Sequence, residues 1–78
     1  MSEALLYIRS NGSIVRYPGG FWAADDSVQV ERGGVKIPKE HFSTRTIEGL
    51  ERRGLIAPTE YRKIKNLNIQ VPIRFEPL

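Results

Sequence analysis

The chain has 78 residues, which suits one domain, and residues 1–78 are expected to form that single domain. It has no cysteine, which excludes a disulfide framework and a thiolate metal site, and its apolar runs are too short to span a bilayer. The shares of hydrophobic residues (40%) and charged residues (27%) are typical of a soluble globular protein, and the net charge of +3 permits a polyanionic partner without requiring one.

The first segment, residues 2–12, has two interpretations. As a helix, it would begin with Ser2 as N-cap and end at Asn11 or Gly12 in the left-handed conformation. As part of a hairpin, it would turn at the same Asn-Gly pair, which is a favoured two-residue turn. The Ala-Leu-Leu run favours the helix by propensity. An acidic residue ahead of this apolar run and Arg9 behind it do not form a signal-peptide pattern, so we expect a cytoplasmic protein.

Residues 13–37 have the pattern of short strands joined by glycine turns. β-Branched residues and a tyrosine in 13–17 favour a strand, and "PGG" suits a type II turn into a returning strand, "FWAA". Trp22, the only tryptophan, is expected to anchor the core. Alternating apolar residues over 27–37 predict a second hairpin that turns at "ERGG".

Pro38 begins a part of the chain with a helical pattern. The segment "PKEHF", residues 38–42, is typical of a single helical turn with proline at its first position. A second helix is predicted to follow, with Ser43 as its N-cap. Ile47 and Leu50 are three residues apart, so they point the same way and are expected to face the core.

Gly54 is placed to end this second helix in the left-handed conformation. A short strand is expected over 55–57, then a loop or ribbon over 58–68. Residues 68–77 alternate between apolar and polar side chains, which predicts a final strand. Pro72 has no N–H to donate to a ladder, so this strand is expected at an edge of the sheet.

The segment from 52 to 65 concentrates positive charge. It holds five bases and one acid, so it alone is more positive than the whole chain. A solvated loop is the common reason for such a run, and a phosphate-contacting segment is the alternative. The bases are Arg52, Arg53, Arg62, Lys63 and Lys65, and the acid is Glu60.

The order of elements over residues 38–76 resembles the winged helix-turn-helix domain. "TI..LERRGLI" is similar to the end of the recognition helix and the start of the wing in bacterial repressors of the multidrug-resistance type. The arrangement of "YPGGFW" ahead of "STRTIEGLERRGLI" is similar to that in small uncharacterised proteins of proteobacteria and their phages. The resemblance implies an α+β fold, namely a small winged-helix-like domain with short helices and antiparallel β-hairpins.

The function that this resemblance implies is binding to duplex DNA, as a small transcriptional regulator of a phage or plasmid. The second helix would enter the major groove and the wing would contact phosphates. Two half-sites would suit a homodimer, formed through strand 68–77 and its twin. Carried onto this chain, the groove-facing residues are Ser43, Thr44, Arg45, Glu48 and Arg52, and the wing residues are Arg62, Lys63 and Lys65.

The sequence offers little for catalysis, and we expect neither an enzyme nor a cofactor or metal site. His41 is the single histidine and is expected to be partly exposed in a short helix. Asp25 and Asp26 are expected to serve a turn or a cap. "RGG" and "PGG" lack the spacing and the Lys-Ser/Thr ending of a phosphate-binding loop.

Two other functions also fit the sequence. The first is a protein-interaction module without nucleic-acid binding, such as a phage or plasmid adaptor or an inhibitor of a host complex. The mild net charge, with Glu48 and Glu51 on the expected recognition helix, favours it. The second is binding to single-stranded nucleic acid, which needs aromatic side chains exposed beside the basic cluster. The candidate aromatic residues are Tyr17, Phe21, Trp22 and Tyr61.

Overall fold

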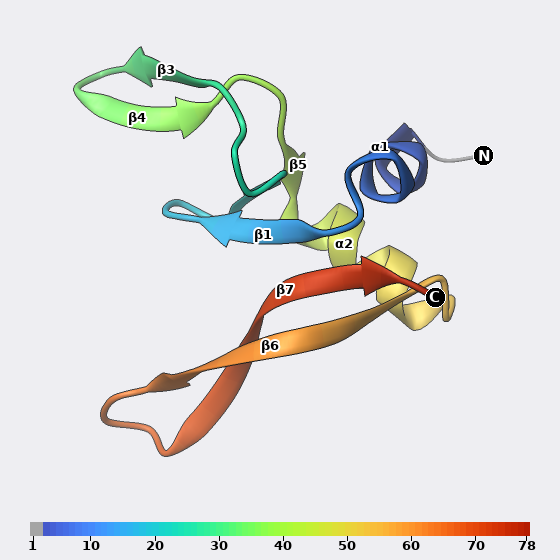
Figure 1. Cartoon of the computed structure of the whole chain (residues 1–78). Coiled ribbons are helices and arrows are strands. Elements are labelled where there is room, and N and C mark those ends of the chain that lie inside the picture. The colour runs from blue at the N-terminus through green and yellow to red at the C-terminus, as the bar shows by residue number, and fades with distance from the viewer. Residues whose placement is uncertain (1–2) are drawn as a thin grey trace.

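A computed structural model describes residues 3–78, which form two helices and seven strands (Figure 1). Neither helix is long and apolar enough to cross a membrane. In chain order the elements are α1 (Glu3–Asn11), β1 (Ile14–Tyr17), β2 (Phe21–Ala23), β3 (Gln29–Arg32), β4 (Val35–Pro38), β5 (Phe42–Ser43), α2 (Thr44–Arg52), β6 (Ile56–Ile64) and β7 (Ile69–Pro77).

Most of the strands belong to one antiparallel sheet of five strands, in the order β5-β2-β1-β7-β6. β3 and β4 form a separate two-stranded hairpin. The fold is therefore α+β but rich in strands, and the prediction of a winged-helix-like domain is wrong. A winged helix places one helix directly ahead of the recognition helix, and this chain does not.

The segment that was expected to supply that extra helix, residues 38–42, is instead a short connection between β4 and β5. Pro38 ends β4, and Phe42 pairs with Trp22 across β5 and β2. Main-chain pairing with β2 therefore overrides the local preference for a helical turn after the proline. Only α2 is left in this half of the chain, so no helix-turn-helix unit can form.

The first segment is helical, as its propensity predicts. α1 buries Ala4, Leu5 and Ile8 on one side. It ends where the N–H of Gly12, at φ +83°, donates to the carbonyl of Ile8. The hairpin interpretation of this segment is therefore excluded, because the Asn-Gly pair ends a helix. Ser2, the expected N-cap, lies outside the described residues.

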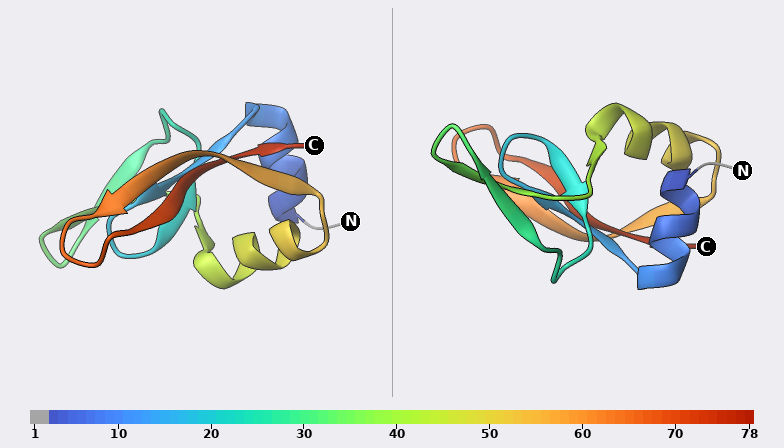
Figure 2. Two further views of the ribbon diagram at one scale, coloured as in Figure 1. Left: turned by 90° about the horizontal axis from the view of Figure 1, so that it is seen from below. Right: turned by 90° about the horizontal axis from the view of Figure 1, so that it is seen from above.

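The core lies at one end of the sheet, where both helices pack (Figure 2). Trp22 is buried as predicted, and its ring meets that of Phe75 edge to face with centroids 5.3 Å apart. From this end, the hairpins β1–β2, β3–β4 and β6–β7 extend away from the helices (Figure 2). The core residues are Ala4, Leu5, Ile8, Ile14, Trp22, Ile47, Leu50, Ile56 and Phe75.

The basic segment after α2 is a strand and not a loop. β6 begins at Ile56 and continues to Ile64, paired with β7 along its length, with register shifts around Glu60. Of the two expectations for 58–68, the ribbon is therefore confirmed, and the loop is limited to the turn at residues 65–68. We call the outer part of this hairpin, residues 61–73, the β6–β7 arm.

The expectation that the final strand is an edge strand is also wrong. β7 lies between β1 and β6, and the sheet edges are β5 and β6. β1 pairs with β7 only at Phe75 and Arg74, so Pro72 lies beyond the reach of β1. Towards β6, Pro72 lies opposite Tyr61, next to the register shift at Glu60. The homodimer through strand 68–77 stays a prediction, although Arg74 and Phe75 of that strand already pair with both β1 and β6.

The buried position of Leu50 generates a stability test. Leu50 is only 3% exposed in the core, so Leu50→Ala should lower the free energy of unfolding by about 2–4 kcal/mol. Urea unfolding followed by tryptophan fluorescence measures this change. Glu48→Ala, on the exposed face of the same helix, is the control and should change stability by less than about 0.5 kcal/mol. Equal effects of the two substitutions would contradict the packing described above.

Candidate nucleic-acid interface

α2 has the caps and the inward face that its sequence predicts. The hydroxyl of Ser43 accepts a hydrogen bond from the N–H of Thr46 at 3.3 Å, which starts the helix. Ile47 and Leu50 are buried. Gly54, at φ +75°, ends the helical segment, and its N–H donates to the carbonyl of Glu51. These residues therefore serve the fold of the helix itself.

Thr44 joins the start of α2 to the β1–β2 turn. Its hydroxyl oxygen accepts a hydrogen bond from the indole N–H of Trp22 at 3.0 Å, and its O–H donates to the carbonyl of Gly20 at 3.2 Å. The side chain is only partly exposed. The hydroxyls of Thr44 and Ser43, two of the residues expected to contact DNA, are thus both engaged within the protein.

The remaining expected groove residues lie on the exposed face of α2 but do not make it basic. Arg45, Glu48 and Arg52 are all exposed, and so is Glu51. Two acids therefore balance the two bases between Thr44 and Arg52. The exposed face of this helix presents no net positive charge to a phosphate backbone.

The expected wing residues gather on the β6–β7 arm, away from the helical end (Figures 1 and 2). Arg62, Lys63 and Lys65 are exposed, and within residues 3–78 none of them forms an ion pair. No acid occurs from 61 to 73. The eight expected site residues therefore form two groups, five at β5 and α2, where Glu48 and Glu51 offset the two arginines, and three basic ones on this arm.

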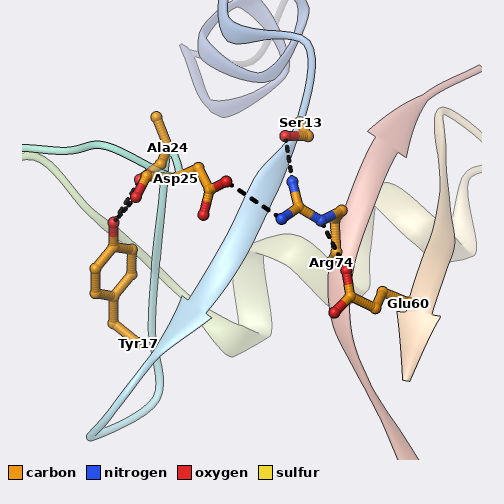
Figure 3. A network of polar contacts seen from close by, with 6 residues as sticks. All are labelled: Ser13, Tyr17, Ala24, Asp25, Glu60 and Arg74. Carbon is orange, nitrogen blue, oxygen red and sulfur yellow. Dashed lines mark hydrogen bonds and ion pairs between the residues drawn. The ribbon is translucent and has the colours of Figure 1, made fainter. Parts of the chain in front are cut away.

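Arg74 has a different role from the other bases of the hairpin, as Figure 3 shows. Its Nε donates to Glu60 at 3.1 Å, and its two Nη atoms donate to Asp25 at 3.3 Å and Ser13 at 3.1 Å. The hydrogen bond to Glu60, followed by that to Asp25, raises the pKa of Arg74. Its charge is matched by two carboxylates, so Arg74 braces β7 against its neighbours and offers little to an external anion.

A notch opens between the β1–β2 hairpin and the β6–β7 arm, because β1 and β7 pair only as far as Val15 and Arg74. The notch has a volume of about 340 Å³. No local signal in the sequence points to Arg16 at this site, because Arg16 and Arg62 are far apart in the chain and are brought to the same notch only by the sheet. The lining residues, which define the hairpin notch, are Arg16, Tyr17, Pro18, Gly19, Arg62, Val71 and Ile73.

The side chains that were considered for catalysis make contacts that serve the fold. His41 is partly exposed, as expected, although it lies between β4 and β5 rather than in a helix. Its Nδ1 is 2.9 Å from the carbonyl oxygen of Pro38, and its ring meets that of Phe21 edge to face. Within residues 3–78, no three His, Cys, Asp or Glu side chains are grouped so that they could hold a metal ion.

Comparisons with known proteins identify no relative: no protein-family model matches the chain, and neither a curated protein nor a solved structure matches it significantly.

The hydroxyl of Thr44 generates a second stability test. In Thr44→Val the indole N–H of Trp22, which is 3% exposed, loses its acceptor. We expect the free energy of unfolding to fall by about 1–3 kcal/mol, the cost of a buried unsatisfied donor. Thr44→Ser keeps the hydroxyl and should retain most of the stability. Urea unfolding of both variants makes the comparison, and a Val variant as stable as the Ser variant would show that this hydrogen bond is dispensable.

Proposed function

We propose that the protein binds duplex DNA through the β6–β7 arm. The major groove is wide enough to admit a two-stranded β-ribbon, and the arm is a ribbon that extends beyond the core (Figure 2). Lysine and arginine side chains on such a ribbon can neutralise phosphates on either side of the groove. This proposal keeps the expected partner but assigns the binding to a different element from the recognition helix.

The observation that carries the proposal is the charge of the arm. Three exposed basic side chains lie on the arm, namely Arg62, Lys63 and Lys65, and none of them forms an ion pair within residues 3–78. The arm itself, residues 61–73, contains no acidic residue. α2, by contrast, carries equal numbers of acids and bases. Because non-specific DNA affinity comes mainly from the number of phosphates neutralised, the arm supports binding better than the helix does.

The proposed function predicts which substitutions change the salt dependence of binding. The wild-type protein should bind a labelled random-sequence duplex with a slope of log K against log salt of about −3, for about three phosphate contacts. Lys63→Ala should flatten this slope by about one unit and weaken binding to all sequences alike. Fluorescence anisotropy over a series of salt concentrations measures both quantities.

Arg45→Ala is the matched control, since it removes one positive charge from the exposed face of α2. It should leave the slope unchanged if the arm binds the duplex. If Arg45→Ala changed the salt slope and Lys63→Ala did not, the assignment of DNA binding to the arm would be overturned. Absence of salt-sensitive binding by the wild-type protein would overturn the proposed function itself.

A protein partner is the second candidate, and the apolar residues of the same arm favour it. Tyr61, Leu67 and Ile69 are 52%, 63% and 50% exposed on the arm. Exposed apolar residues next to bases suit a partner surface with apolar and acidic groups. The test is whether the protein captures a partner protein. Loss of capture in Leu67→Ser, with capture kept in the control Val35→Ser on the β3–β4 hairpin, would support this function over DNA binding.

A further inference from the structure

The hairpin notch shares Arg62 with the proposed duplex site and adds features that the duplex site does not use. It lies at the divergence of two hairpins, where Arg16 and Tyr17 have no pairing partner on β7. Its volume of about 340 Å³ is at the lower end of the range for small-ligand sites. The notch is therefore large enough for one small ligand and too small for a duplex.

The charge of the notch comes from two arginines on its opposite walls. Arg16 extends from the β1–β2 hairpin and Arg62 from β6, and both are exposed and without an ion pair within residues 3–78. Both arginines also line an adjoining groove together with the acids Asp25 and Glu60, and each of these acids forms an ion pair with Arg74. Two unpaired guanidinium groups are a suitable pair of donors for a phosphate, which they can hold by charge-assisted hydrogen bonds.

The remaining lining is aromatic and apolar. The hydroxyl of Tyr17 donates to the carbonyl of Ala24 at 2.6 Å and lies 3.0 Å from that of Asp25, as Figure 3 shows. These hydrogen bonds fix the position of the Tyr17 ring, and the residue stays partly exposed. Val71 and Ile73 add an apolar floor. A fixed aromatic ring beside guanidinium groups is the chemistry that proteins use to stack an unpaired base.

We propose that the hairpin notch binds a nucleoside phosphate unit, with its phosphate between Arg16 and Arg62 and its base against Tyr17 and the apolar floor. The proposal goes beyond the duplex site, because a base inside a duplex is paired and stacked and cannot enter the notch. The unit is either a free nucleotide or one nucleotide of a single strand. Neither Lys63 nor Lys65 lines the notch.

The test is fluorescence anisotropy with a labelled thymidine single strand of about eight nucleotides. A strand of the same length that lacks its bases is the first comparison. It should bind about 5- to 100-fold more weakly, because stacking on the ring and floor is lost. Thymidine 5′-monophosphate as competitor then identifies the source of the ligand. Displacement at a concentration within about tenfold of the strand's Kd indicates a free nucleotide, and failure to displace indicates a nucleotide held within a strand.

Arg16→Ala and Arg32→Ala form a matched pair, since each removes one exposed arginine from a β-hairpin and only Arg16 lines the notch. Arg16→Ala should weaken single-strand binding by about 5- to 10-fold, and Arg32→Ala by less than about twofold. Equal binding of the strands with and without bases, or equal effects of the two substitutions, would overturn the proposal. The duplex site is tested separately by Lys63→Ala, so failure at one site is distinguishable from failure at the other.

Discussion

The short pairing of β1 with β7 is the contact on which the rest of the structure depends. It joins the first strand to the last, at Ile14 opposite Phe75 and Val15 opposite Arg74. Phe75 is thereby brought against Trp22, and the two rings become the centre of the core. Without this pairing, the buried faces of α1 and α2 would have no common surface to cover. A chain of 78 residues buries a limited share of its surface, so the loss of this contact would affect the whole fold.

The same pairing explains why the protein has a notch. It ends at Arg74, whose guanidinium joins Glu60 on β6 to Asp25 and Ser13. Beyond that point the two hairpins separate, and their side chains are not held by core packing. The buried apolar side chains are therefore concentrated at the helical end. The hairpins carry basic side chains without an ion pair among residues 3–78, and exposed aromatic rings. The candidate sites lie where the sheet is no longer needed for stability.

The resemblance to a winged helix arises from local requirements that many folds share. In "TIEGLERRGLI" two inward apolar residues, Ile47 and Leu50, are followed by a glycine that ends the helix and by a strand. Any fold that turns a short helix into a strand favours such a pattern. The difference lies in what precedes α2. Phe42 and Ser43 pair with β2, so the chain enters α2 from the sheet and not from another helix.

The sequence by itself determined the local features of this protein. Helix propensity predicted α1, the Ser43 cap and the apolar spacing predicted α2, and alternation predicted β7, because these signals come from near neighbours in the chain. The tertiary structure decided the features that depend on distant partners. It decided that the basic segment extends β6 as a ribbon rather than a loop, placed β7 inside the sheet and engaged Thr44 with Trp22. It also brought Arg16 beside Arg62, since strand pairing joins residues whose separation in the chain carries no local signal.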